Sequence, residues 1–268
     1  MAKFAISNLA FKERSLGDTL MFLQNSQVEG LEIAPSLIWK EPECASKKER
    51  TEFKDLLSSH GLSVVSLQSL LYGKPELQLF DSSNTQEILL EYLKEMVDLC
   101  ADLGGRSLSF GSPRNRRRGE LGLSEAISRA TPLFYALAEY AKPANIIICI
   151  EPVASSYDCD FINDTEEAVR LIESVGHSNF KLLLDTGTLI LNKEGCDKAV
   201  RKNFHHISHV HINDPQLFPP SIKMKEHFIV ADTLRSLGYS GWLTLEFMQC
   251  YTSPERDIVY GLECYGRP

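Results

Sequence analysis

Short apolar runs, each about the length of a strand, alternate along the chain with longer stretches in which apolar residues recur every three or four positions. The short runs are rich in Ile, Leu and Val, which is typical of strands that are buried on both faces. Four predicted strands lie near residues 3–9, 30–35, 62–68 and 106–112, and four more follow in the runs NIIICIEP, KLLLDTG, ISHVHIND and WLTLEF.

The longer stretches predict amphipathic helices between these strands. In residues 85–104 the apolar positions Ile88, Leu89, Tyr92 and Met96 follow the spacing of one buried helical face, and Gly104 offers a C-cap. Similar patterns cover residues 46–59, 123–141, 164–175, 195–203 and 226–237.

About eight strand and helix units in one chain of this length predict a single-domain α/β protein, a (β/α)8 TIM barrel over residues 1–268. A doubly wound open sheet is the alternative, but it usually has fewer strands and a Gly-rich phosphate turn. No GxGxxG or GxxxxGK[ST] motif is present. We find no linker or low-complexity tract that would divide the chain.

Four acidic or imidazole side chains stand at the ends of the last four predicted strands. We call them the four strand-end residues: Glu151, Asp185, His211 and Glu246. In a parallel barrel all strands end on the same face, so the four side chains can converge. Three carboxylates and one imidazole suit a hard divalent cation, and three buried carboxylates without a cation would be costly. The alternative is that each acid is capped separately by a helix N-terminus or an arginine.

Composition narrows the class of protein further. The chain has 268 residues, 43% hydrophobic and 24% charged, with a net charge of −8 and a pI near 5.4, which argues against bulk binding to nucleic acid or to an anionic membrane. The first residues show no signal-peptide pattern and no long apolar span occurs, so we expect a cytoplasmic protein. The seven cysteines form no CxxC motif and are odd in number, which favours reduced thiols.

Other polar and aromatic residues are candidates for binding a substrate at the barrel mouth. Glu32 and Gln68 end the second and third strands, where they could bind hydroxyl groups or a neighbouring strand end. Trp39 and Tyr72 lie in mouth loops and could line a pocket, or simply pack within their loops. His209 lies on the same strand face as His211 and could orient it, or be a satisfied core histidine.

One basic cluster, RNRRR at residues 114–118, follows the fourth strand and therefore lies on the presumed active-site face. An arginine there would suit a phosphate or carboxylate on a substrate. A solvated loop is the alternative for most of the cluster.

As a set, the motifs EP, LLLDTG, HVHIND and LTLEF at the four strand ends resemble those of the xylose isomerase-like barrel superfamily of sugar and sugar-phosphate isomerases and epimerases. The blocks ISNLAF, GLEIAPSLIW, SLQSLLYGKPELQLF, FGSPRNR and YDCDFIN also resemble one bacterial branch of sugar phosphate isomerases/epimerases, in which Arg116 matches a recurrent arginine.

The resemblance implies a function and roles for the strand-end residues. All four match the family's metal ligands, for one ion of Mn2+ or Mg2+, with Co2+ and Zn2+ as further candidates. Glu151 and Glu246 match the pair that moves protons. The implied activity is a divalent-metal-dependent isomerisation or epimerisation of a sugar or sugar phosphate, by proton transfer through a metal-stabilised enediolate. Dimers or tetramers are common in the family, so a homo-oligomer is a further expectation.

The sequence also departs from known branches of that family. Thr188 and Leu217 stand where ketose 3-epimerases carry a histidine and an arginine that grip the substrate, and Gln68, Phe110 and Thr188 stand where the abasic-site nucleases carry extra metal-binding histidines. The first difference argues against a free ketohexose as the substrate, and the second argues against nuclease activity. Two alternatives stay open: a metal-dependent dehydratase of a keto-cyclitol or dehydroshikimate-like acid, and a non-catalytic sugar-binding barrel.

Overall fold

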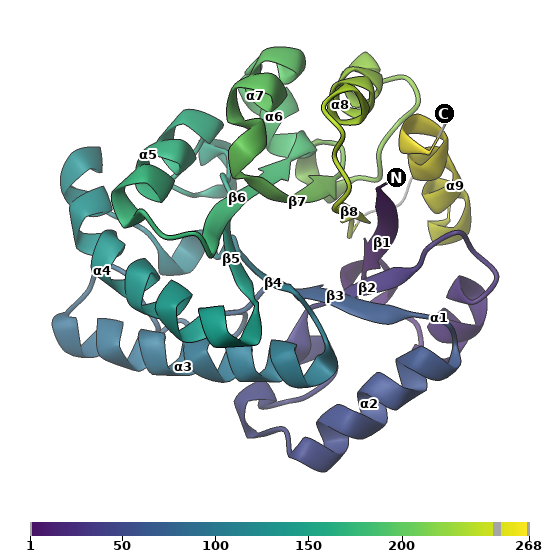
Figure 1. Cartoon of the computed structure of the whole chain (residues 1–268), viewed down its shortest axis with the longest axis horizontal. Helices are drawn as coiled ribbons and strands as arrows, with labels where there is room; N and C mark the ends of the chain where they lie inside the picture. Colours follow the sequence, from purple (N-terminus) through teal and green to yellow (C-terminus); the bar gives the residue numbers. More distant parts are fainter. Residues whose placement is uncertain (1, 249–252, 267–268) are drawn as a thin grey trace.

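A computed structural model describes residues 2–248 and 253–266 and shows a closed barrel of parallel strands with helices around it (Figure 1). The strands pair in chain order, and β1 closes the barrel by pairing with β8 from Lys3↔Trp242 to Ile6↔Leu245. The predicted TIM barrel is confirmed, and each predicted strand is present: β1 Lys3–Ser7, β2 Gly30–Ile33, β3 Ser63–Leu67, β4 Ser107–Phe110, β5 Ile147–Ile150, β6 Phe180–Asp185, β7 Ile207–Ile212 and β8 Trp242–Leu245.

The helices that the apolar spacing predicts are present with nearly the predicted bounds: α2 Lys47–Ser59, α3 Ser83–Leu103, α4 Leu123–Ala141, α5 Thr165–Val175, α7 Cys196–Asn203 and α8 Lys225–Ser236. Local capping explains several of these bounds. Ser46 and Glu49 form a reciprocal capping box at the start of α2, and Gly104 ends α3 in the left-handed conformation, with φ 87°.

Three further helices lie outside the predicted ranges: α1 Leu16–Leu23, α6 Thr186–Asn192 and α9 Pro254–Tyr265. The short α6, with the sequence TGTLILN, is rich in β-branched residues and glycine, which have low helix propensity. It forms because the side chain of Asp185, the last residue of β6, accepts a hydrogen bond from the Thr188 N–H and so caps the helix. The strand therefore passes directly into a helix at one of the strand-end residues.

Apolar side chains pack between the strands and the helices, whereas polar side chains meet inside the barrel. Leu182 and Leu184 are fully buried in β6, whereas Ser66, Ser109 and Thr244 are buried polar residues of β3, β4 and β8. The strand register places polar residues side by side. His211 of β7 pairs with Asp185 of β6 and with Thr244 of β8.

Cysteine and membrane predictions can also be compared with the structure. Cys44, Cys100, Cys149, Cys159 and Cys196 are present as thiols, as predicted, whereas Cys250 lies outside the described residues. Burial raises the pKa of Cys149 to about 12, in keeping with a packing role. Within the part of the chain that the structure describes, no helix is long and apolar enough to cross a membrane.

Candidate metal centre

The four strand-end residues meet at one place on the C-terminal face of the barrel. Each offers one ligand atom, and these four atoms all lie within 4.8 Å of one another. The site is assembled by four neighbouring strands: Glu151 follows β5, Asp185 ends β6, His211 lies in β7 and Glu246 follows β8. The parallel barrel therefore brings together residues that are far apart in the sequence, as the strand-end pattern predicts.

His211 has no exposed surface and lies among carboxylates on both sides of its ring. Its Nδ1 is 3.0 Å from Glu246 Oε2 and 3.5 Å from Glu151 Oε1, and its Nε2 is 2.8 Å from Glu32 Oε2. None of these contacts has the geometry of a hydrogen bond, so among the described residues both ring nitrogens have no hydrogen-bond partner. The buried Nδ1, which faces the carboxylates of Glu246 and Glu151, fits a ligand of a divalent cation.

Both oxygens of the Asp185 carboxylate accept a hydrogen bond. The Thr188 N–H donates to Oδ1 at 2.6 Å, and the Asn213 amide donates to Oδ2 at 2.7 Å. Burial, together with the charge of Glu151, raises the pKa of Asp185 to about 6. The group is therefore expensive to charge while no cation is bound.

Glu246 is held from two sides by side-chain amides. We assign the Gln68 amide nitrogen to the side that faces the Glu246 and Glu32 carboxylates, because carboxylates only accept hydrogen bonds. In this orientation it donates to Glu246 Oε1 at 2.6 Å and to Glu32 Oε2 at 3.2 Å. The Asn213 amide donates to Glu246 Oε2 at 3.3 Å. Burial raises the pKa of Glu246 to about 7, against the opposing charge of His211.

Glu32 lies beside His211, on the side of the imidazole ring opposite Glu246. It is fully buried and accepts hydrogen bonds from the hydroxyl groups of Ser66 and Ser109. Burial alone would raise its pKa, but the charge of His211 and the polar contacts of His209 and His211 outweigh burial and hold the pKa well below its usual value. Burial alone would lower the pKa of His211, but the charges of Glu246 and Glu32 outweigh burial and hold that pKa well above its usual value.

His209 contacts Glu32 at the carboxylate oxygen that does not face His211. Its Nε2 lies 3.1 Å from the Thr244 hydroxyl and 3.4 Å from Glu32 Oε1, and its ring is 5.3 Å from that of His211. Through Glu32 it is connected to the imidazole that would bind the ion. Glu32, His209 and His211 also form a second cluster whose ligand atoms lie within 4.8 Å of one another.

Arg116 lies inside the protein and does not project into the barrel mouth. It has no exposed surface, and its Nη2 donates to the backbone carbonyls of Glu151 at 2.8 Å and Ile162 at 3.3 Å. Arg117 pairs with Asp158, and Arg118 donates to the Asp160 carbonyl at 2.6 Å. Substrate binding by Arg116 stays a prediction, and the observed guanidinium ties the end of β4 to the loop after β5.

The structure does not bring the two predicted aromatic residues into the cluster. Trp39 packs edge-on against Phe53 of α2 at 5.2 Å between ring centroids, and the Tyr72 side chain is 75% exposed. Their predicted role in lining a substrate pocket stays a prediction. Glu32 and Gln68 do lie at the site, but both are buried and bonded to protein groups, as the alternative of bonds between strand ends describes.

Three residues at the site were missed in the sequence. Asn213 stands two positions after His211, a spacing that places both on one face of an extended chain. Gly111 and Gly187 follow strands closely, and a Cβ on Gly111 would lie 2.3 Å from Glu151 Oε2, while one on Gly187 would lie 2.1 Å from Asn213 Oδ1. A glycine just after a strand-end position is the sequence pattern that could have pointed to them.

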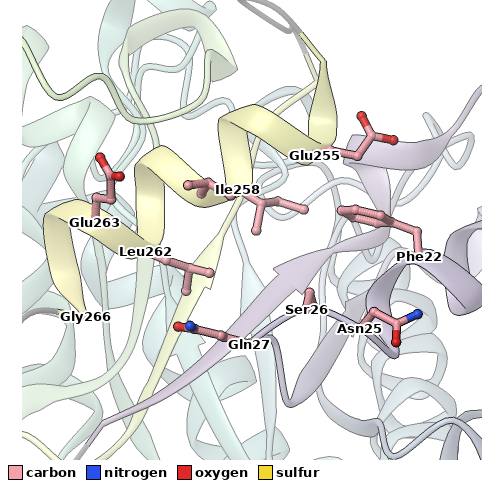
Figure 2. Close-up of a pocket in the computed structure, with 10 residues that line it drawn as sticks. Phe22, Asn25, Ser26, Gln27, Glu255, Ile258, Leu262, Glu263 and Gly266 are labelled. Atoms are coloured by element: carbon pink, nitrogen blue, oxygen red, sulfur yellow. The ribbon is translucent and has the colours of Figure 1, made fainter.

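A groove of about 690 Å³ lies on the outer wall of the barrel, where Ile258 and Leu262 of α9 and Phe22 of α1 point toward one another (Figure 2). None of the strand-end residues lines it. It is separate from the candidate metal centre and has no charged cluster comparable with it.

Comparison with known proteins agrees with this fold. The chain belongs to the xylose isomerase-like TIM barrel family, whose model matches residues 28–266. The resemblance predicted from the strand-end motifs is therefore confirmed at the level of the family.

Similar proteins are sugar epimerases. The L-ribulose 3-epimerase of Mesorhizobium japonicum is 27% identical over 158 residues, which cover 59% of this chain and 53% of that enzyme. The D-psicose 3-epimerase of Enterocloster bolteae is 24% identical over 119 residues, covering 44% of this chain and 39% of that protein. The aligned segments thus span about half or less of these relatives.

Among solved structures, the 3-keto-D-glucoside 4-epimerase of E. coli matches with a TM-score of 0.79 at 16% identity, covering 98% of this chain and 100% of the other. At this level of identity the likeness shows a common fold.

Proposed function

We propose that this protein is a divalent-metal-dependent isomerase or epimerase of a sugar, with Mn2+ or Mg2+ held by the four strand-end residues. The observation that carries the proposal is the convergence of four ligand atoms, from three carboxylates and one imidazole, within 4.8 Å. The similarity to ketose 3-epimerases supports the class of substrate.

A bound divalent ion would polarise a substrate carbonyl and so acidify the adjacent C–H group. Glu151 and Glu246 are the residues that we assign to moving that proton. Their side chains keep 15% and 10% exposure, whereas the His211 side chain has none, so the two carboxylates border the space that a substrate can reach.

Three of the four arginines in the basic cluster already have partners within the protein, which favours an unphosphorylated sugar as the substrate. Arg116, Arg117 and Arg118 are engaged by backbone carbonyls and aspartates of the barrel loops. A phosphate would have to replace these contacts, and it would also approach a site lined by carboxylates.

The test is hydrogen exchange from solvent. In D2O with Mn2+, the protein should introduce deuterium at the carbon next to the carbonyl of a free ketopentose such as L-ribulose, and NMR would show it. Glu246→Gln and Glu151→Gln should each lower exchange by at least about a hundredfold, because each removes one proton-moving carboxylate. Irreversible loss of water without exchange would point to the dehydratase, and binding without exchange to a non-catalytic barrel.

A further inference from the structure

Asn213 is the one described side chain that hydrogen-bonds two of the strand-end carboxylates at once. It is 2% exposed and follows the end of β7. Its amide N–H groups donate to Asp185 Oδ2 at 2.7 Å and to Glu246 Oε2 at 3.3 Å. The reverse orientation would set a carbonyl oxygen against two acceptors, so the amide can face the site in one way only.

The position of Asn213 is fixed by the first turn of α6. The Thr186 hydroxyl donates to the Asn213 carbonyl at 2.8 Å and accepts from the Asn213 N–H at 2.9 Å. Gly187 leaves the space for the amide, because a Cβ there would lie 2.1 Å from Asn213 Oδ1. The first turn of α6, which Asp185 caps, thus leaves room for the Asn213 amide, which also bonds Asp185.

The segment after Asn213 is anchored from the other side by a buried chain of hydrogen bonds. Asp214 Oδ1 lies 2.6 Å from His227 Nε2, and His227 Nδ1 lies 3.0 Å from the Tyr265 hydroxyl. All three side chains are buried, and they connect the end of β7 to α8 and α9. The backbone around Asn213 therefore has little freedom to move away from the two carboxylates.

We propose that Asn213 is a positioning residue that sets the orientation of the Asp185 and Glu246 carboxylates relative to each other, and that Gly187 is required because it admits the amide. Partners that bond metal-binding carboxylates orient them and raise affinity for the ion. Because the same amide bonds Asp185 and Glu246, it would affect both ion binding and proton transfer. This inference rests on the proposed function.

The experiment uses Asn213→Ala, Gly187→Ala and the double variant, and it measures the Mn2+ dissociation constant by calorimetry together with crystal structures of the metal-free proteins. Each single variant should bind Mn2+ about 10–100-fold more weakly. In both, the Asp185 carboxylate should rotate away from its present orientation. The double variant should bind no more weakly than Asn213→Ala, because the severe overlap of a methyl group at position 187 is with the Asn213 amide, and the Asp214 carbonyl lies farther away, at 3.2 Å.

The matched control is Asn179→Ala, the same change at the opposite end of β6. The Asn179 amide donates to the Ile146 carbonyl at 3.0 Å, so its loss removes a structural hydrogen bond far from the strand ends. The control should leave Mn2+ affinity within about twofold of the wild type. Gly187→Ala should fold, since Gly187 is helical and alanine favours helices.

Three results would overturn the inference. One is unchanged Mn2+ affinity and carboxylate orientation in Asn213→Ala. Another is independent, additive losses in the double variant. The third is a raised KM with unchanged Mn2+ affinity, which would make Asn213 a substrate-binding residue. If the wild type binds no Mn2+, the proposed function fails, and the carboxylate orientations in the metal-free crystal structures decide this inference alone.

Discussion

At the scale of single residues, the site is governed by the cost of placing charges together. Asp185 and Glu246 have raised pKa values because both are buried, and His211 has a raised pKa because carboxylates surround it. Without an ion, protons on these groups replace part of the missing positive charge. Binding of a divalent ion must therefore release protons.

The metal-free protein should become less stable as the pH rises from 5 to 8. Asp185 and Glu246, with pKa values of about 6 and about 7, hold protons that the unfolded chain has already lost above about pH 4, so unfolding becomes easier through this window. His211 stabilises the folded state fully below its usual pKa, and this stabilisation is lost as the pH rises through its raised folded pKa. His211 therefore also makes the folded protein less stable at higher pH. Glu32 acts only at more acid pH, because its pKa is lowered.

Thermal unfolding in EDTA across this pH range measures the effect. Glu246→Gln is the control and should show a shallower decline, since it removes one of the shifted groups. A melting temperature that rises from pH 5 to 8 in the metal-free wild type would contradict this electrostatic picture.

At the scale of elements, Arg116 joins the loop after β4 to the end of β5. Its guanidinium donates to the Glu151 carbonyl and to the Ile162 carbonyl, so it supports the backbone that carries the Glu151 carboxylate. Arg116 thus supports the site through the Glu151 backbone, which it bonds from inside the protein.

Arg116→Met should lower the free energy of unfolding by about 2–4 kcal/mol, because it leaves buried carbonyls without donors. Urea denaturation measures this loss. Arg129→Met is the control: Arg129 forms an exposed pair with Glu125 on α4, and its loss should cost no more than about 0.5 kcal/mol. Unchanged stability of Arg116→Met combined with weaker sugar binding would show instead that the guanidinium reaches the substrate.

Elements with strong periodicity were predictable from the sequence, and elements set by tertiary context were not. The strands and α3 follow from apolar runs and spacing, and the convergence of the four strand-end residues follows from the rule that parallel strands end on one face. The helix α6 was not predictable from propensity, because its cap is the carboxylate of Asp185. The burial of Arg116 was equally hidden, since the sequence does not tell which arginine of a basic run turns inward.

At the scale of the whole molecule, the two halves of the barrel contribute differently to the site. The last four strands, β5 to β8, supply the four strand-end residues, whereas β2 and the end of β3 supply Glu32 and Gln68, which contact His211 and Glu246. Figure 1 shows why this works: the closed ring of strands places the second and third strands across the barrel from the sixth and seventh. Ion binding should therefore stabilise the barrel as a unit.

The most direct test of the metal centre is elemental analysis of the purified wild type and of Asp185→Asn after incubation with Mn2+ and removal of free ion. Asparagine keeps the shape and the capping ability of Asp185 but removes its charge, so the fold should be retained. We expect about one divalent ion per chain in the wild type and little or none in the variant. Equal ion content in the two proteins, or none in the wild type, would contradict a metal centre at the ends of β5 to β8.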